Sequence, residues 1–140
     1  MKYLLDTNVI SEARKKPGRR DPKFHQWIAS VAPTDAAISV ITLGEVLAGV
    51  IRMERKDAAQ GAQLRLWYQN NVLTQFSDRL LPVTQTIAEI EAQLQVPDPR
   101  PKADALIAAT ALAHNLVLVT RNVPDFQGTG VRYLNPWAAN

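Results

Sequence analysis

The chain has 140 residues, of which 46% are hydrophobic and 21% are charged, and it contains no cysteine. This length supports one hydrophobic core, so we expect a single domain over residues 1–140 rather than a disordered or multidomain chain. The lack of cysteine excludes disulfides, thiolate metal sites and cysteine nucleophiles. A net charge of +3 favours an anionic partner. No apolar run reaches membrane-spanning length or resembles a secretory signal, so we expect a cytoplasmic protein that does not enter a membrane.

The first half of the chain alternates short apolar strands with helices. We expect a strand over residues 2–5, followed by a helix that Asp6 caps and that runs to Arg14. A second helix is expected over residues 21–31, because an aspartate cap is followed there by a proline in the first turn. A strand over residues 36–40 then leads to a helix that begins at Thr42.

The second half repeats this alternation. We expect a long helix over residues 57–77, a brief strand over residues 80–83 and a helix from Thr84 to Leu94. After a proline-rich joint, the pattern predicts these further elements: an apolar helix over residues 103–114, ended by Asn115, and strands over residues 116–119 and 131–134. Such an order predicts a helix-rich, three-layer α/β/α domain with a short central parallel sheet.

Four acids stand near strand ends or in the first turns of the helices that follow. Each has an ordinary structural explanation: Asp6 as a helix cap, Glu45 as the partner of Thr42 in a capping box, Asp104 as a complement to the helix dipole and Asp125 as a turn residue. All four explanations place the carboxylates at the same edge of the sheet. Carboxylates that converge repel one another and must become protonated or share a cation. An oxygen-only ligand set suits Mg²⁺ or Mn²⁺, which can activate a water for attack on phosphate.

Asp104 is the most informative of these acids. It is the only charged residue between positions 103 and 113, and apolar residues surround it on every side of the expected helix. A helix of this composition is buried, and a buried carboxylate must be paired, hydrogen-bonded or bound to a metal.

Other chemistries have little support. The chain carries no phosphate-binding or dinucleotide-binding glycine loop. His25 and His114 fit no catalytic triad or metal spacing; we expect His25 on the surface and His114 at the C-terminal end of a helix, where it complements the helix dipole. The scattered aromatics Trp67, Tyr68 and Trp137 are expected to pack in the core or at an interface rather than form a platform for bases.

Cations gather in the loop over residues 14–20, around a Pro-Gly turn. Such a run is more often a solvated loop than a clamp for an anion. The alternative is that basic side chains hold the phosphates of RNA on either side of the cleaved bond; the candidates are Arg14, Lys15, Arg19, Arg20 and Arg121.

Several segments together resemble the PIN-domain ribonucleases. They are LLDTNVIS at residues 4–11, SVITLGE at residues 39–45, DALIAATA at residues 104–111, VTRNVPDF at residues 119–126 and NPW at residues 135–137. The order and spacing of the segments are similar to those of VapC toxins of bacterial toxin–antitoxin pairs, particularly the FitB-like branch. The resemblance therefore implies a single PIN domain.

The resemblance also implies a Mg²⁺- or Mn²⁺-dependent endoribonuclease that hydrolyses phosphodiester bonds. Asp6 and Asp104 would be the principal metal ligands, and Glu45 and Asp125 would bind a second ion or orient the attacking water. The residues that would hold this pocket together through hydrogen bonds are Asn8, Thr120 and Asn122.

Members of the family commonly dimerise and are silenced by a small antitoxin, so the implied partners are RNA, an antitoxin and a second copy of the chain. The loop over residues 14–20 and the helices over residues 57–95 match the family loosely, which leaves the choice of RNA open. One alternative is a PIN-like module that has lost catalysis and binds nucleic acid or protein. A phosphohydrolase with an aspartate nucleophile is a weaker alternative, because Asn8 stands where such enzymes place a second aspartate.

Overall fold

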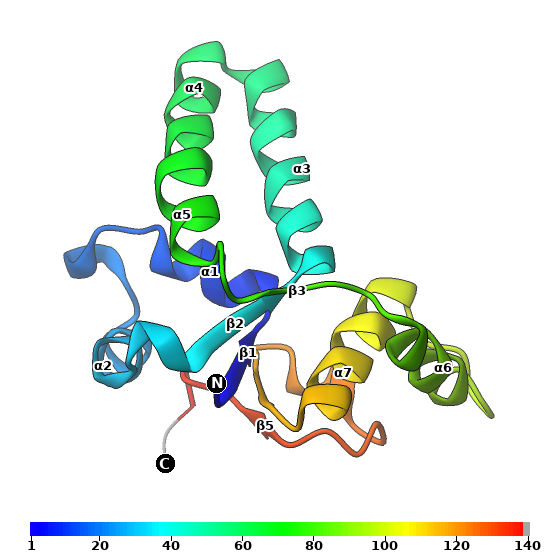
Figure 1. The fold of residues 1–140 in the computed structure, drawn as a ribbon. Coiled ribbons are helices and arrows are strands. Elements are labelled where there is room, and N and C mark those ends of the chain that lie inside the picture. The colour runs from blue at the N-terminus through cyan, green and yellow to red at the C-terminus, as the bar shows by residue number, and fades with distance from the viewer. Residues whose placement is uncertain (139–140) are drawn as a thin grey trace.

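The computed structural model describes residues 1–138 of the chain. Within these residues, five parallel strands form one sheet in the order β3-β2-β1-β4-β5. The strands are β1 (Tyr3–Leu5), β2 (Ala36–Ser39), β3 (Leu80–Leu81), β4 (Val117–Val119) and β5 (Tyr133–Leu134). The first strand of the chain therefore lies at the centre of the sheet, as Figure 1 shows.

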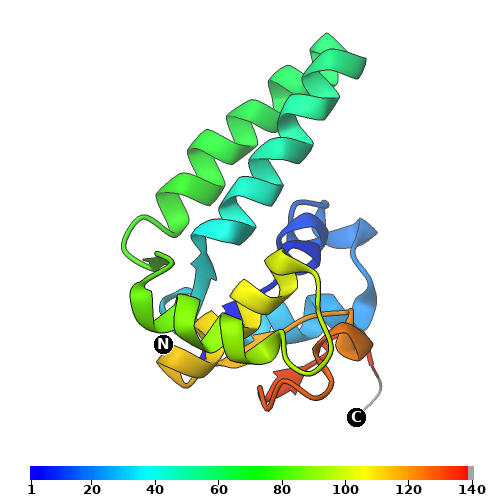
Figure 2. The ribbon, with the colours of Figure 1, turned by 90° about the vertical axis from the view of Figure 1, so that its right-hand side faces the viewer.

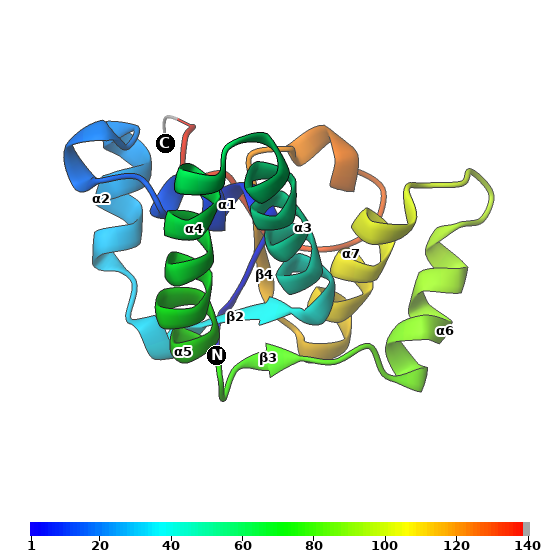
Figure 3. The same cartoon turned by 90° about the horizontal axis from the view of Figure 1, so that it is seen from above.

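Helices connect these strands and cover both faces of the sheet. They are α1 (Thr7–Ala13), α2 (Pro22–Ser30), α3 (Val40–Lys56), α4 (Ala58–Trp67), α5 (Leu73–Gln75), α6 (Gln85–Leu94) and α7 (Lys102–His114). A π-helical turn, η3 (Tyr68–Val72), joins α4 to α5, and the 3-10 turns are η1 (Pro17–Arg19), η2 (Pro33–Asp35) and η4 (Val123–Phe126). Seen from above, α6 and α7 lie on the opposite side of the sheet from α2 (Figure 3). The expected α/β/α layering is confirmed.

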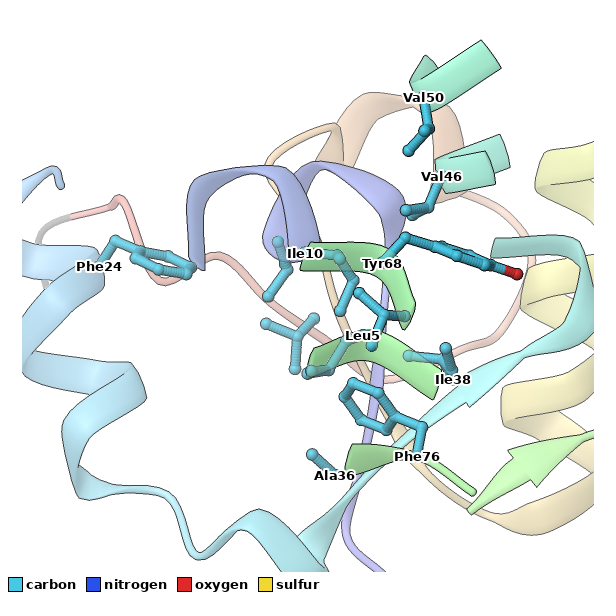
Figure 4. Close-up of a cluster of buried hydrophobic side chains, with 12 residues drawn as sticks. Leu5, Ile10, Phe24, Ala36, Ile38, Val46, Val50, Tyr68 and Phe76 are labelled. Atoms are coloured by element: carbon cyan, nitrogen blue, oxygen red, sulfur yellow. The ribbon is translucent and has the colours of Figure 1, made fainter. Parts of the chain in front are cut away.

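Two hydrophobic clusters fill the two faces. Successive residues of a strand point to opposite faces, so Leu5 packs with α1, α2 and α3, whereas Leu4 packs with α7. The first cluster, drawn in Figure 4, contains Phe24 and Ile38 and reaches Tyr68, the first residue of the π-helical turn. The expectation that the aromatics pack in the core is confirmed, since Tyr68 is buried and the side chains of the two other residues are partly buried against this cluster: Trp67 and Trp137.

Helix α7 is as closely packed as its composition predicts. Ala108 and Ala111 are completely buried between the helix and the sheet. The helix ends at Asn115, whose φ of 55° is the left-handed conformation that asparagine tolerates at this position. The small alanines let α7 approach the sheet closely, which fixes the first turn of the helix relative to the strand ends.

The start of α3 differs from the sequence-based expectation. The helix begins at Val40, and Ser39 caps it by accepting a hydrogen bond from the Ile41 N–H at 3.0 Å. The predicted capping box between Thr42 and Glu45 is therefore wrong. Strand β2 already ends at a serine, which supplies the cap earlier than the pattern indicated. Thr42 is instead fully buried, and its hydroxyl has no hydrogen-bond partner among residues 1–138.

Helices α3 and α4 form a hairpin that projects from the body of the protein (Figures 1 and 2). Gly61 allows the two helices to approach, because a Cβ at this position would lie only 2.7 Å from the backbone nitrogen of Glu54. Arg65 donates two hydrogen bonds of 2.7 Å to the Glu54 carboxylate at the same level. Across residues 1–138, the helices are too short or too polar to cross a bilayer.

Candidate active site at the carboxyl edge of the sheet

The carboxyl ends of β1, β2 and β4 meet at one edge of the sheet, because these three neighbouring strands run parallel. Asp6 follows β1 directly, and Thr120 follows β4 directly. Glu45 stands in the second turn of α3, which leaves the end of β2. In parallel α/β sheets this edge is where ligands bind.

Asp6 is the most firmly held acid of the site. Its side chain is 5% exposed, and its carboxylate accepts three hydrogen bonds. One oxygen accepts from the Thr7 N–H at 2.8 Å, which is the expected capping role at the start of α1. The other oxygen accepts from the Thr120 hydroxyl at 2.8 Å and from the Asn8 side-chain amide at 3.1 Å. One carboxylate oxygen of Asp6 therefore caps helix α1, and the other oxygen accepts the hydrogen bonds that orient the side chain in the site.

Thr120 and Asn8 link the two ends of the chain around this carboxylate. The Thr120 hydroxyl is fully buried and also accepts a hydrogen bond from the Asn122 N–H at 3.0 Å. The Asn8 side-chain oxygen accepts from the Arg121 N–H at 3.0 Å. Asn122 contributes only its backbone, because its side chain is exposed and makes no hydrogen bond to residues 1–138. The network thus fixes the turn after β4 against the turn after β1.

Glu45 is oriented by a residue that the sequence analysis did not select. The Thr7 hydroxyl donates a hydrogen bond of 2.6 Å to the Glu45 carboxylate, which is otherwise exposed on α3. The only local signal was the position of Thr7 in the first turn of α1, directly after Asp6. Its contact with a helix 38 residues away depends on the packing of α1 against α3.

Asp104 lies in the first turn of α7 and is half-buried. It accepts no hydrogen bond from residues 1–138, and the cap of the helix is Pro101, which has no side-chain donor or acceptor. Partial burial is the largest cause that raises the pKa of the Asp104 carboxyl above its ordinary value. Repulsion from the other three acids raises this pKa further, in the order Asp125, Asp6 and Glu45.

Asp125 stands in the first turn of η4 and is exposed. It is the strongest of the three charges that act on Asp104, so the turn after β4 brings it close to the start of α7. The structure therefore gathers all four predicted acids into one electrostatic neighbourhood. Asp6 is buried and held by hydrogen bonds, Asp104 is half-buried, and Glu45 and Asp125 are exposed.

The donor chemistry of this cluster suits a hard divalent cation. Its ligand atoms are carboxylate oxygens, and repulsion within the cluster disfavours the charged form of Asp104 unless a positive charge is shared. As the side chains stand, no three acids or histidines among residues 1–138 form a ready coordination shell. Asp125 is exposed and makes no side-chain hydrogen bond to residues 1–138, so it can change rotamer toward a cation.

Two of the five predicted RNA-binding side chains, Arg20 and Lys15, are engaged in contacts within the protein. Arg20 is half-buried and donates to the carbonyl oxygens of Ala13 at 2.6 Å and Lys15 at 3.0 Å. It therefore stabilises its own loop, and we remove it from the set of phosphate ligands. Lys15 pairs with Glu12 at 2.9 Å, which neutralises part of its charge.

The remaining cations are open to solvent. Arg19 is exposed in η1. Arg14 lines a cavity of about 240 Å³ between α1, α3 and α4 that also contains Thr7 and Glu45. Arg121 is exposed beside Thr120, and its guanidinium lies over the ring of Trp137. Arg14 thus lines the same cavity as Glu45, whereas Arg121 adjoins the site through its backbone, whose N–H donates to the Asn8 side chain.

Fold and site together define a helix-rich α/β domain with a pocket of carboxylates at the carboxyl edge of a parallel sheet. The family model of the PIN domain matches residues 3–127. The chain belongs to the PIN-domain family, which confirms the membership that the motifs predicted.

Relatives of this chain match it over nearly its whole length. Toxin FitB of Neisseria gonorrhoeae is 34% identical, and the match covers 96% of this chain and 97% of that protein. A VapC ribonuclease of Sinorhizobium fredii is 33% identical, with 96% of each chain covered. A solved structure of FitAB bound to a DNA fragment superposes with a TM-score of 0.89 at 30% identity, covering 99% of this chain and 97% of the other.

Proposed function

We propose that this protein is a Mg²⁺- or Mn²⁺-dependent endoribonuclease that acts as the toxin of a toxin–antitoxin pair. The observation that carries the proposal is the convergence of four carboxylates at one sheet edge, where three of them raise the pKa of the fourth, Asp104. Relatives that match the chain over 96% of its length are named a toxin and a ribonuclease, which supports the same activity.

Each acid has a distinct part in this proposal. Asp6 and Asp104 would hold the metal ion, because the first is fixed by three hydrogen bonds and the second is fixed by the packing of α7. Glu45 and Asp125 would complete the site or orient the water, since both are exposed beside it. A bound Mg²⁺ or Mn²⁺ supplies a Lewis acid for the phosphate oxygen and lowers the pKa of a bound water.

The remaining residues of the site would act by positioning. Thr120 and Asn8 keep the Asp6 carboxylate turned in one direction, and Thr7 does the same for Glu45. Such preorganisation matters because a misplacement of about 1 Å in a catalytic group costs about a hundredfold in rate.

The proposed partners are single-stranded RNA, a small antitoxin and a second copy of the chain. Single-stranded regions of RNA can reach an open acidic pocket, whereas a duplex holds its phosphates in a fixed helical shape. The antitoxin proposal is supported by a structural relative, whose description names a FitAB complex bound to DNA. We expect the activity in the cytoplasm, where its RNA substrates are.

The proposal is tested by cleavage of a single-stranded RNA by the purified chain, with Asp104→Asn as the decisive variant. We expect cleavage that needs Mg²⁺ or Mn²⁺, stops with a chelator, and is lost in Asp104→Asn while the fold is kept. Asp98→Asn is the matched control, because Asp98 is exposed in the proline-rich joint and is not among the charges that raise the pKa of Asp104. Undiminished cleavage by Asp104→Asn would refute the assignment.

A catalytically inactive PIN-like module is the second candidate. The observation in its favour is that the acids do not form a coordination shell without side-chain movement. Titration with Mn²⁺ separates the two candidates: an active site binds the ion and loses that binding in Asp104→Asn. Failure of the unmodified chain to bind Mn²⁺ or cleave RNA would select the inactive module.

A further inference from the structure

The segment NPW at residues 135–137 has no part in the acidic site, although it was one of the segments that identified the family. It follows β5, whose last residue, Leu134, accepts a hydrogen bond from the Thr120 N–H at 3.0 Å. The tail therefore leaves the sheet directly beside the turn that carries the site. Asn135 then accepts a hydrogen bond from the Trp137 N–H at 2.9 Å, which closes a turn and sets the position of the indole.

Trp137 is anchored on one side by the core. Its ring packs on the ring of Phe24, with centroids 4.8 Å apart and an interplanar angle of 30°. Phe24 is completely buried, so this contact ties the tail to α2. A partly buried indole held in this way is a rigid surface rather than a mobile side chain.

Arg121 covers Trp137. The guanidinium carbon lies 5.4 Å from the centroid of the Trp137 ring, within the range of a cation–π contact. The backbone of Arg121 is fixed to the site, because its N–H donates to the Asn8 side chain at 3.0 Å. Both ends of the arginine are therefore positioned: the backbone by the acidic site and the guanidinium by the indole.

Among residues 1–138 the guanidinium of Arg121 has no acidic partner, although the backbone of this residue is hydrogen-bonded to the acidic site through Asn8. No carboxylate oxygen of residues 1–138 lies within 4.0 Å of it, and its N–H groups make no hydrogen bond to these residues. The contact with the indole uses no hydrogen bond of the guanidinium, so its N–H groups remain available to a ligand. An arginine in this state is suited to bind a phosphate through two parallel hydrogen bonds.

We propose that Trp137 is a positioning residue that holds the Arg121 guanidinium for a phosphate of the RNA strand next to the cleaved bond. The indole holds the guanidinium over the tail, while the backbone of the same arginine is anchored to the acidic site through Asn8. This proposal rests on the proposed function, because RNA is the ligand that brings phosphates to the acidic site.

The test is a double-mutant cycle on RNA binding, measured with a single-stranded RNA oligonucleotide by fluorescence anisotropy at several KCl concentrations. All variants carry Asp104→Asn so that the RNA stays intact. Arg121→Ala is expected to reduce the slope of log K against log salt by about 0.7, the value for one phosphate contact on a single strand. Trp137→Leu is expected to change the slope in the same direction and to weaken binding about two- to fivefold, the range of an exposed cation–π contact.

The double variant separates positioning from general packing. We expect Arg121→Ala with Trp137→Leu to bind no more weakly than Arg121→Ala alone, because the tryptophan acts through the arginine. Trp137→Phe keeps an aromatic face and is expected to keep the slope. Trp27→Leu is the matched control: Trp27 packs on Tyr3, and no arginine or lysine of residues 1–138 makes a cation–π contact with it, so its loss should leave the slope unchanged.

The outcomes that would overturn the proposal are specific. Arg121→Ala with an unchanged slope would show that the arginine holds no phosphate, and this variant decides the question even if Trp137→Leu fails to fold. If the losses of RNA affinity in Arg121→Ala and Trp137→Leu multiplied in the double variant, Trp137 would act independently of Arg121, as a packing residue only. A chain that binds RNA as expected here but cleaves none in Mn²⁺ would refute the nuclease proposal and leave this one standing.

Discussion

Two threonines of this protein are completely buried yet differ in what their hydroxyls contact. Thr120 donates to the Asp6 carboxylate at 2.8 Å and accepts from the Asn122 N–H at 3.0 Å. Thr42, in the first turn of α3, has no partner among residues 1–138. Substitution of each by valine keeps the shape and the β-branch and removes only the hydroxyl. The two variants therefore measure how much a buried threonine hydroxyl contributes to stability with and without hydrogen-bond partners.

We expect the two valine variants to change the free energy of unfolding in opposite directions. Thr120→Val removes a hydrogen bond to a charged acceptor, so we expect a loss of about 1.5–3 kcal/mol in the free energy of unfolding. Thr42→Val removes a buried hydroxyl that has already lost its hydrogen bonds to water, so we expect a gain of about 1 kcal/mol. A third buried threonine, Thr110, donates only to the Leu106 carbonyl of its own helix, and its valine variant should change stability by less than about 1 kcal/mol.

Urea unfolding of the three variants, followed by circular dichroism, checks this order. At this chain length each kcal/mol corresponds to a shift of roughly 3–5 °C in the melting temperature, so thermal unfolding gives an independent reading. Thr120→Ser keeps the hydroxyl and should recover most of the lost stability. If Thr42→Val destabilised the protein as much as Thr120→Val, the argument from hydrogen-bond partners would be refuted.

Three further predictions concern the site and the hairpin. Because the pKa of Asp104 is raised in the fold, its ionisation should cost the metal-depleted protein stability as pH rises through that pKa, while the lowered pKa values of Glu12, Glu54 and Glu91 act in the opposite direction. The free energy of unfolding of Asp104→Asn, relative to that of the unmodified chain, should therefore rise over this pH range; pH–stability curves of identical shape would contradict it. Gly61→Ala should cost about 1–3 kcal/mol, because its Cβ would lie 2.7 Å from a backbone nitrogen of α3. Gly49→Ala, with its nearest atom at 4.0 Å, should instead gain about 0.5–1 kcal/mol in the same unfolding assay. Thr7→Val should leave stability nearly unchanged and lower the kcat for RNA about tenfold to a hundredfold through Glu45; an unchanged kcat would show that this hydrogen bond is not used.

Much of the architecture follows from local patterns in the sequence. Period-two and period-3.6 patterns predicted the strands and helices, with bounds that differ from the observed ones by at most two residues. The polar residues Asp6 and Asn115 marked helix ends correctly, because capping depends on the residue and its immediate neighbours. The π-helical turn over residues 68–72 was not predicted, since it interrupts a helix that the pattern shows as continuous.

The convergence of the acids was also predictable, for a topological reason. Parallel strands bring their carboxyl ends to one edge, so residues that follow these ends must approach one another wherever the strands are neighbours. Asp6 and Thr120 meet because β1 and β4 are paired. The sequence by itself therefore determined the layers, the family and the four acids that face one edge.

Only the tertiary structure decided which side chains touch. Ser39, not the predicted Thr42, caps α3, because β2 ends at Ser39. Glu45 accepts a hydrogen bond from Thr7, which the sequence did not predict. Arg20 turned inward to two carbonyl groups, whereas Arg121 came to lie on an indole 16 positions further along the chain. Such contacts join residues far apart in sequence, and their geometry depends on how helices pack after the sheet has formed. Periodicity carries no information about that packing, because it describes which face of an element is buried and not what lies against it.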